Sequence, residues 1–271
     1  MIETEKILLD SEMIHSRLSR EGVGCPLFYA ETIDSTNEWA KREAGNAAVD
    51  GSVYLADHQT AGKGRRGRVW KSPEGTSISM SLLLRPEIPA DRISMLTLIM
   101  GLSAAQGMKA ATGLDVGIKW PNDVVSRGKK LCGILTEANA AVDYVVIGIG
   151  INCNMEAFSE ELSQIATSLK LELETEVSRE EVTAQVLKAF YRNYALFRET
   201  CTISGVLKKE YEELLVNMNQ QVRVLDPKGE YNGISKGINE LGELLVEKAD
   251  SGEAEAVYAG EVSVRGIYGY V

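Results

Sequence analysis

The sequence is poor in the residues that build metal sites and disulfide frameworks. It has two histidines, His15 and His58, and four cysteines in 271 residues. With so few ligands we do not expect a Cys/His zinc site. The cysteines are scattered with no CxxC pair, and free thiols in a cytoplasmic protein explain them better than disulfides; they are Cys25, Cys132, Cys153 and Cys201.

Positive charge and long apolar runs are scarce as well. The net charge is −10 and the sequence pI is about 4.9, whereas binding to nucleic-acid phosphates needs a basic face. Apolar stretches are interrupted well short of a membrane span, and residues 1–10 lack the basic start and apolar stretch of a signal peptide. We therefore expect neither a nucleic-acid partner nor a membrane partner.

Hydrophobic residues make up 44% of the chain, enough for one sizeable core and a small second domain. Periodicity predicts a short amphipathic helix over 10–20, with Met13, Ile14 and Leu18 on one face. Strands and helices then follow in a pattern that predicts an α+β protein. The predicted strands are 27–33, 51–59, 77–86, 116–121, 129–138 and 144–154, and the predicted helices begin near Ser35 and cover 90–113 and roughly 178–216.

The pattern changes after Met218. Short strands separated by Gly, Pro and Asn turns are predicted at 221–226, 230–238, 242–248 and 256–265, as in a small β-barrel of about 50 residues. We therefore divide the chain into an N-terminal helical extension (1–27), a main domain (28–217) and a C-terminal barrel (218–271).

The most informative segment is the loop 61–68, AGKGRRGR. Four cations, Lys63, Arg65, Arg66 and Arg68, lie within six residues and alternate with three glycines. Most charged loops are merely solvated. In an otherwise acidic protein, however, interleaved glycines and guanidinium groups favour anion binding, because backbone amides and arginine forks both bind phosphate oxygens. The nucleotide motifs GxxxxGK[ST] and GxGxxG are absent.

Four further motifs are ambiguous when each is taken alone. KWPND offers Lys119, Asn122 and Asp123 at a strand end, where α/β proteins gather ligand groups, but it also fits a plain turn. RGKK places two lysines at the mouth of a strand, which fits a surface position. GIGIN at 148–152 leaves room for a flat ligand or marks a bulge. DSTN at 34–37 offers polar groups or a simple helix cap.

Taken together, the motifs resemble biotin protein ligases. The matching run is IDSTN, QTAGKGRRGRVW, KWPND, KKLCGIL, IGIGIN and GEVSVR, and it covers roughly residues 28–271. The resemblance implies a mixed β-sheet packed with helices, the biotin/lipoate ligase-like catalytic domain, followed by an SH3-like β-barrel. One departure is Lys63, where the family loop usually has arginine; lysine keeps the charge and loses the fork.

Site residues are carried over from this resemblance motif by motif. Those implied to bind biotin are Ser35, Thr36, Asn37, Gln59, Lys63, Arg65, Lys130 and, through its backbone, Gly133. Those implied to bind ATP are Arg65, Arg68, Trp70 (over the adenine), Lys119, Asn122, Asn152 and Arg265, with Asp123 serving Mg²⁺. Lys130 and Arg65 are the implied catalytic residues, because they neutralise two anions that must meet.

The implied reaction is ATP-dependent formation of biotinyl-AMP and transfer of biotin to one lysine of a biotin carboxyl carrier protein domain. The biotin carboxylate is already ionised near neutral pH, so the first step needs no general base. A homodimer is also implied. About 27 residues precede the first predicted strand, and we expect no winged DNA-binding domain there. The alternatives are a lipoate or octanoyl transferase and, outside enzymes, a biotin-sensing repressor or a plain binding module.

Overall fold

A mixed seven-stranded sheet forms the centre of the computed structural model, which describes residues 8–46, 48–226, 229–259, 263–266 and 270–271. The strand order is β1-β2-β3-β7-β6-β5-β4; β1 and β2 are parallel and every other pair is antiparallel. The strands are β1 (Leu27–Ile33), β2 (Ser52–Gln59), β3 (Ser77–Leu84), β4 (Gly117–Lys119), β5 (Asp123–Ser126), β6 (Lys129–Ala138) and β7 (Val145–Asn152). The predicted mixed sheet is confirmed.

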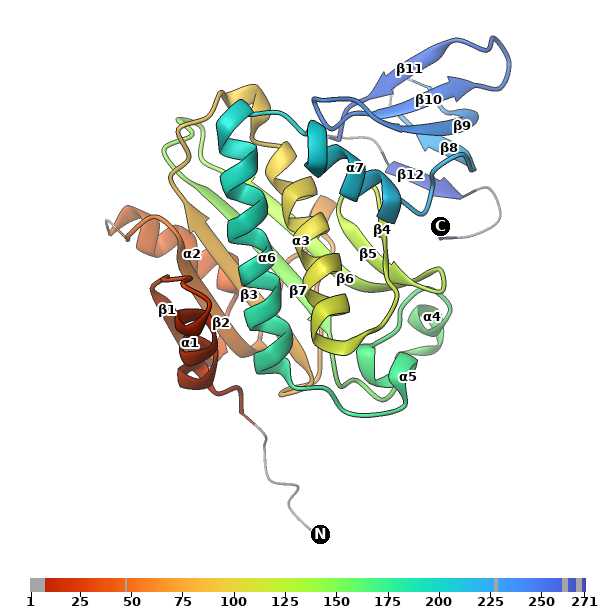
Figure 1. The fold of residues 1–271 in the computed structure, drawn as a ribbon. Coiled ribbons are helices and arrows are strands. Elements are labelled where there is room, and N and C mark those ends of the chain that lie inside the picture. Colours follow the sequence, from red (N-terminus) through yellow and green to blue (C-terminus); the bar gives the residue numbers. More distant parts are fainter. Residues whose placement is uncertain (1–7, 47, 227–228, 260–262, 267–269) are drawn as a thin grey trace.

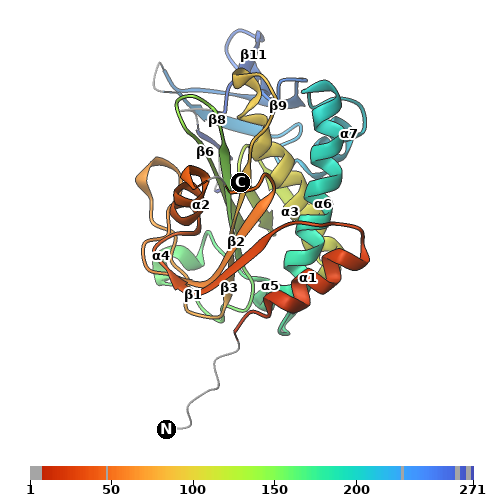
Figure 2. The ribbon, with the colours of Figure 1, turned by 90° about the vertical axis from the view of Figure 1, so that its left-hand side faces the viewer.

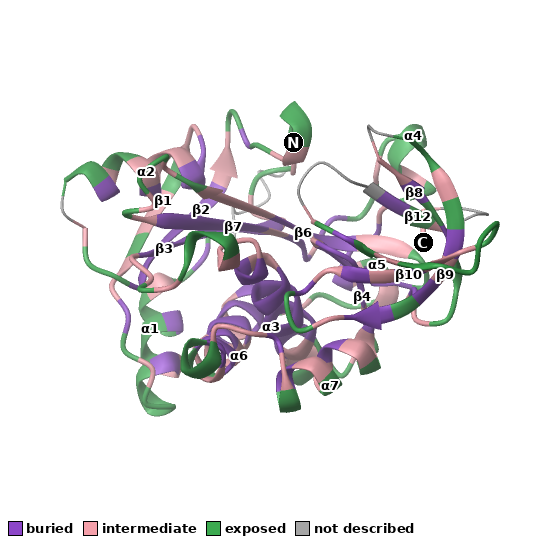
Figure 3. Ribbon diagram, turned by 90° about the horizontal axis from the view of Figure 1, so that it is seen from above, coloured by how far each residue is buried: buried purple, intermediate pink, exposed green. Residues whose placement is uncertain are grey.

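Helices cover both faces of this sheet (Figures 1 and 2). One face carries α3 (Met95–Thr112) and α6 (Arg179–Thr200), with α1 (Ser11–Arg20) packed beside α6. The other face carries α2 (Thr36–Gly45), which contacts β2, β3 and β7. Strands β3 and β7 therefore have helices on both sides, which explains why almost every side chain along them is buried (Figure 3).

The main core lies between the sheet, α3 and α6. Helix α3 is apolar nearly all round because it is enclosed by the sheet on one side and by α6 on the other. Gly101 lies over Ile134 of the sheet. Gly107 instead faces α6: a Cβ there would lie 2.5 Å from the backbone of Val186. Gly107 thus permits close contact between α3 and α6.

The C-terminal region forms a separate five-stranded antiparallel sheet, so the expected SH3-like domain is confirmed. Its strands are β8 (Gln221–Leu225), β9 (Tyr231–Ile238), β10 (Leu244–Lys248), β11 (Ala254–Val257) and β12 (Ser263–Gly266), in the order β11-β10-β9-β8-β12. The single strand predicted over 256–265 is two strands. Residues 260–262 of the GEVSVR motif lie outside the described residues.

Other boundaries also differ from the predictions. The helix predicted from residue 90 begins at Met95, after a short 3-10 turn at Ala90–Arg92. Two short helices, α4 (Glu160–Ser163) and α5 (Leu169–Leu173), were not predicted, and the stretch 178–216 is broken into α6 and α7 (Gly205–Leu214). On α1, Ile14 and Leu18 are buried as predicted, but Met13 is exposed. In the described part of the chain, none of the helices has the length and hydropathy that a bilayer-spanning segment requires.

The KWPND motif does not simply end a strand. Its residues form the turn of a hairpin in which Lys119 at the end of β4 pairs with Asp123 at the start of β5. The strand predicted over 116–121 is therefore shorter than expected, and β5 was missed. The consequence for the site is that Lys119 and Asp123 lie side by side on neighbouring strands.

Candidate active site

Two connected pockets open above the sheet, between α2, the loop 61–68 and the C-terminal domain. The small pocket encloses about 450 Å³, part of it open to solvent, and its wall includes Ser35, Thr36, Asn37, Gln59, Gly133 and Gly148. The large pocket encloses about 2010 Å³, again partly open to solvent, and reaches Arg265 and Tyr270 of the C-terminal domain. Both share a junction formed by Gly64, Arg65, Trp70, Asn122 and Lys130.

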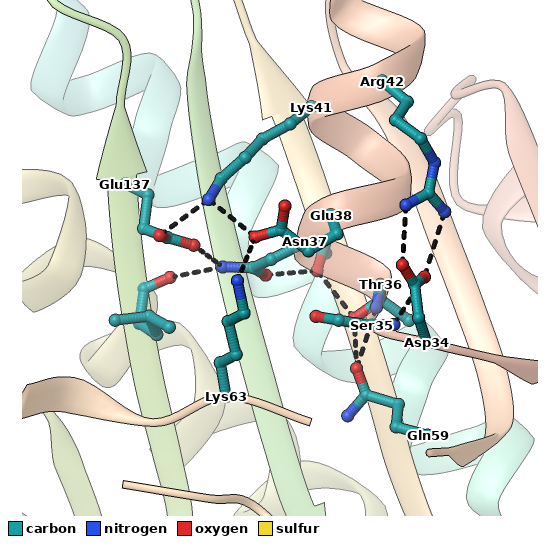
Figure 4. A network of polar contacts seen from close by, with 12 residues as sticks. Asp34, Ser35, Thr36, Asn37, Glu38, Lys41, Arg42, Gln59, Lys63 and Glu137 are labelled. Atoms are coloured by element: carbon teal, nitrogen blue, oxygen red, sulfur yellow. Dashed lines mark hydrogen bonds and ion pairs between the residues drawn. The ribbon is translucent and has the colours of Figure 1, made fainter. Parts of the chain in front are cut away.

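The start of α2 supplies the polar wall of the small pocket (Figure 4). Ser35 is the N-cap of this helix but makes no side-chain cap hydrogen bond, so simple capping does not explain it. The backbone N–H of Thr36 donates to Gln59 Oε1 at 2.8 Å, and the Thr36 hydroxyl approaches the same oxygen at 3.2 Å. Because Oε1 is an acceptor here, Gln59 presents its Nε2 as a hydrogen-bond donor.

Asn37 lies behind Thr36 in a chain of polar contacts that the sequence motifs did not reveal. Its Nδ2 donates to Glu137 Oε2 at 2.7 Å, and its Oδ1 accepts from Ser81 Oγ at 2.6 Å. Glu137 also pairs with Lys41 at 2.7 Å (Figure 4). These contacts leave Asn37 only 4% exposed with both ends of its amide bonded.

Three glycines of β6 and β7 make room for side chains of the protein itself. A Cβ at Gly148 would lie 2.1 Å from Asn37 Oδ1, and one at Gly150 would lie 2.4 Å from the Trp70 indole. A Cβ at Gly133 would lie 2.9 Å from the Lys130 ammonium. We predicted space for a flat ligand at Gly148 and Gly150; in this structure Asn37 and Trp70 occupy that space.

The loop 61–68 is folded back on itself. Gly64 N–H donates to the carbonyl of Arg68, Trp70 N–H donates to the carbonyl of Gly62, and Arg65–Gly67 form a 3-10 turn with Arg66 in the left-handed region. Arg65 crosses the junction: it donates to Asn122 Oδ1 at 2.6 Å and to the Ala259 carbonyl of the C-terminal domain at 3.0 Å. Lys63 pairs with Glu38 of α2 at 2.7 Å, so a carboxylate already contacts its ammonium.

Lys130 and Asp123 form an ion pair of 2.6 Å at the junction. Asp123 also accepts from the Tyr270 hydroxyl, and the Tyr270 ring lies 3.6 Å from the Lys119 ammonium. Burial lowers the pKa of Lys119 to about 8, with neighbouring cations adding to the effect. Burial and the Asp123 carboxylate raise the pKa of Tyr270 well above its usual range.

The large pocket is strongly positive despite the acidic chain. Its described lining contains one carboxylate, that of Asp123, and seven cations: Arg65, Arg66, Arg68, Lys71, Lys119, Lys130 and Arg265. Such a lining is suited to a polyanion. Asn152 lies in the same wall, 4% exposed, and donates to the Thr167 carbonyl at 3.0 Å. Over the described ranges, no cluster of three or more His, Cys, Asp or Glu residues forms a metal site.

All the site residues predicted from the sequence line these two pockets, although they come from separate motifs. Those on the small pocket or the junction are Ser35, Thr36, Asn37, Gln59, Lys63, Arg65, Trp70, Asn122, Lys130 and Gly133; Arg68, Lys119, Asp123, Asn152 and Arg265 line the large pocket. The sequence motifs missed Ser81, Glu137 and Tyr270. A signal for Ser81 existed, because Ser77, Ser79 and Ser81 alternate on one face of a strand.

Comparison with known protein families identifies two matching regions. Residues 29–152 match the model described as "Biotin/lipoate A/B protein ligase family", and residues 218–265 match "Biotin protein ligase C terminal domain". The first model covers both biotin and lipoate enzymes, whereas the second is specific to biotin protein ligases. The two matches contain the polar wall, the Arg-rich loop, the junction and Arg265.

Individual relatives are similar over nearly the whole chain. "Bifunctional ligase/repressor BirA" of Bacillus spizizenii is 38% identical over 94% of this chain and 79% of its own length. "Biotin--[acetyl-CoA-carboxylase] ligase" of Mycobacterium tuberculosis is 31% identical over 94% of this chain and 95% of its own. The solved biotin protein ligase of Aquifex aeolicus in complex with biotin and ATP superposes with a TM-score of 0.80 at 31% identity, covering 89% of this chain and 99% of the other.

Proposed function

Because this chain belongs to the biotin protein ligase family, we propose that it activates biotin with ATP and transfers it to a carrier protein. The first product is biotinyl-5'-AMP with release of pyrophosphate. The second is a biotin amide on one lysine of a biotin carboxyl carrier protein domain. The observation that carries this proposal is the junction, where Arg65, Asn122 and Lys130 line a polar small pocket and a cationic large pocket at once.

The two pockets fit the two substrates. Biotin has a cyclic urea at one end and a carboxylate at the other, and the small pocket has a neutral polar wall at one end and cations at the other. The large pocket, with its seven cations, fits a nucleoside triphosphate. Trp70 lies at the junction with its buried Nε1 unpaired among the described residues, and it is the proposed adenine-side wall.

Charge neutralisation is the main requirement of the first step. The biotin carboxylate attacks the α-phosphorus, a new C–O–P linkage forms, and pyrophosphate leaves with the electron pair of the broken P–O bond. Lys130 and Arg65 are the cations positioned where the two anions meet. Fixed charges in a partly dehydrated site stabilise such a transition state without reorganisation, and Asp123 holds the Lys130 ammonium in place at 2.6 Å.

Asp123 is also the proposed protein ligand of Mg²⁺. Magnesium commonly takes one or two protein carboxylates and fills its shell with phosphate oxygens and water, which fits a pocket whose described lining has a single carboxylate. When bound, the ion would supply further positive charge to the phosphates. Asp123 is already shared between Lys130 and Tyr270, so a metal ligand role requires at least one of these contacts to loosen.

We divide the chain into 1–27, 28–217 and 218–271, and the separate sheets support the boundary near residue 217. The C-terminal domain is joined to the main domain by the Trp120 indole, which donates to the Gly242 carbonyl at 3.0 Å, and by Arg65. All four cysteines are free thiols, which supports a cytoplasmic location.

One experiment tests the function. Purified protein is incubated with biotin, ATP and Mg²⁺, and pyrophosphate release and biotinyl-AMP are measured; a carrier domain is then added and its mass is followed. Pyrophosphate release that depends on biotin, followed by a mass gain on one carrier lysine, supports the ligase. Turnover of lipoate or octanoate in place of biotin would instead support the related transferases that share the first family model.

A further inference from the structure

Glu137 is a carboxylate with no role in the chemistry proposed above. It lies near the end of β6, behind the small pocket, with its side chain 29% exposed. Its two oxygens have different partners: Oε1 pairs with the Lys41 ammonium at 2.7 Å, and Oε2 accepts from Asn37 Nδ2 at 2.7 Å (Figure 4). Asn37 is thereby in contact with a group that can only accept hydrogen bonds while it is ionised.

The surroundings of Asn37 fix which end of its amide faces which way. Glu137 and the Leu135 carbonyl, at 3.4 Å, are both acceptors and lie on the Nδ2 side. The Ser81 hydroxyl donates to the opposite end, Oδ1, at 2.6 Å. Rotation of the amide by half a turn would place Oδ1 against the carboxylate, which is electrostatically unfavourable. Oδ1 has a second lone pair, and it lies beside Gly148, which lines the small pocket together with Asn37.

Lys41 determines which partner each oxygen of the Glu137 carboxylate binds. Burial opposes the charged form of Lys41, yet the hydrogen bonds that it donates to Glu137 and Glu38 raise its pKa above the usual value. Lys41 therefore stays protonated and keeps one oxygen of Glu137 occupied. The other oxygen is left for Asn37, so the ion pair and the amide orientation are coupled through a single side chain.

From this geometry we infer that Glu137 is a positioning residue that orients the Asn37 amide, so that the small pocket presents an acceptor at Asn37 and a donor at Gln59. That pattern matches a cyclic urea, which has N–H donors and one carbonyl acceptor. The inference deepens the proposed function and rests on it, because the urea in question is the head group of biotin.

The test uses the difference between a carboxylate and an amide at position 137. In Glu137→Gln the lysine takes the only carbonyl oxygen, and the amide nitrogen then faces Asn37 Nδ2. Asn37 must flip or lose a partner, so biotin Kd, measured by calorimetry without ATP, should weaken by about tenfold, as for loss of one charge-assisted hydrogen bond. The KM for biotin should rise in parallel, with kcat at saturating biotin and KM for ATP changed less than about threefold.

A swap of the two groups should restore binding. Asn37→Asp alone places two carboxylates in contact and should weaken biotin binding by more than tenfold, because like charges at that distance repel. In the double variant Asn37→Asp with Glu137→Gln, the amide now at position 137 donates to one oxygen of the carboxylate now at position 37, and the other oxygen of that carboxylate faces the pocket. The double variant should bind biotin within about threefold of wild type. A double-mutant cycle measures the interaction between positions 37 and 137 directly.

Glu210→Gln is the matched control. Glu210 on α7 is also 29% exposed, accepts an amide N–H from Gln106 at 2.8 Å and pairs with an arginine, Arg192, yet it is not in the lining of either pocket. This variant should bind biotin like wild type. Thermal unfolding of all variants separates a loss of binding from a loss of folded protein.

Each outcome decides the inference. Weak binding by both single variants with recovery in the double variant supports orientation. Equal loss in Glu137→Gln and in the double variant, or no loss in Glu137→Gln, overturns it while leaving the ligase activity intact. A wild type that binds no biotin and releases no pyrophosphate overturns the proposed function first, and the role of Glu137 with it.

Discussion

The two pockets differ in how far their polar and charged groups already have partners within the protein. In the small pocket the supporting polar contacts are already made within the protein: Asn37 bonds Ser81 and Glu137, and Lys63 bonds Glu38. In the large pocket seven cations share one lining carboxylate, so positive charge is left in excess. The small pocket is therefore pre-organised for shape and hydrogen-bond polarity, whereas the large pocket is completed by an anion.

This difference predicts opposite responses to salt and to mutation. Screening weakens interactions between exposed charges and has little effect on buried hydrogen bonds. Variants of the large pocket and junction should act through charge, and variants of the small pocket through geometry.

The largest effect is expected for Lys130→Ala. It removes the cation at the junction and leaves Asp123 without its ion pair, so adenylation measured by pyrophosphate release should fall by about a hundredfold or more. Lys129→Ala is the matched control, because Lys129 is the preceding residue, donates to the Ser163 carbonyl at 2.8 Å and lines neither pocket. A loss of less than tenfold, equivalent to roughly 1.4 kcal/mol of barrier, would show that Lys130 is not central.

Arg65→Gly should release the intermediate prematurely. Arg65 links the loop to Asn122 and to the Ala259 carbonyl of the C-terminal domain. Its removal loosens the closure between the domains and deletes a contact to the anhydride, which is worth roughly 1.5–3 kcal/mol for a charged hydrogen bond. We expect biotinyl-AMP in solution and biotin on lysines of an unrelated protein, at a level about tenfold above wild type.

Mass spectrometry of the bystander protein measures this leakage. Arg127→Gly serves as control, since Arg127 is an exposed arginine on the β5–β6 turn and lines neither pocket. If Arg65→Gly labels bystanders no more than this control does, the arginine contributes static charge alone and does not retain the intermediate.

A pH dependence of ATP binding should come from Lys119. Burial lowers its pKa to about 8 in the free protein, and a bound phosphate raises it again. Below pH 8 Lys119 is charged and attracts ATP; above pH 8 binding must take up a proton, so Kd should weaken by up to about tenfold per pH unit. Calorimetry in two buffers of different ionisation enthalpy measures the proton uptake. Lys119→Arg stays charged and should flatten the profile; an unchanged slope would contradict the assignment.

The sequence predicted the residues that line the pockets better than the residues that support them. Lys130 and Asp123 belong to short motifs whose residue types reveal charge and hydrogen-bonding capacity, and β6 was predicted at its observed bounds. Ser81 and Glu137 lie on strands whose neighbours are set by the non-local order β3-β7-β6, and no local pattern gives that order. Tyr270 reaches the site from the C-terminal domain, and its partners depend on how the two domains pack.

The smallest effect is expected at Tyr270, whose side chain lines the large pocket and contacts two of its charged groups. The Tyr270 hydroxyl donates to Asp123, and its ring covers the Lys119 ammonium. Tyr270→Phe keeps the ring and deletes the hydroxyl, so Lys119 keeps its aromatic neighbour while one oxygen of Asp123 is released. If Asp123 receives Mg²⁺ with ATP through the oxygen that Tyr270 occupies, wild type must break this hydrogen bond on binding and the variant need not.

Tyr270→Phe should therefore bind Mg·ATP more tightly, by about two- to tenfold, the range of one net hydrogen bond. Calorimetric titration with ATP in Mg²⁺ and again in EDTA measures the difference. Because the gain arises from a freed metal ligand, it should vanish in EDTA. A gain of equal size in EDTA would mean that Tyr270 hinders the nucleotide by bulk or charge, and weaker binding in both buffers would make its hydroxyl part of the ATP site rather than a competitor for Asp123.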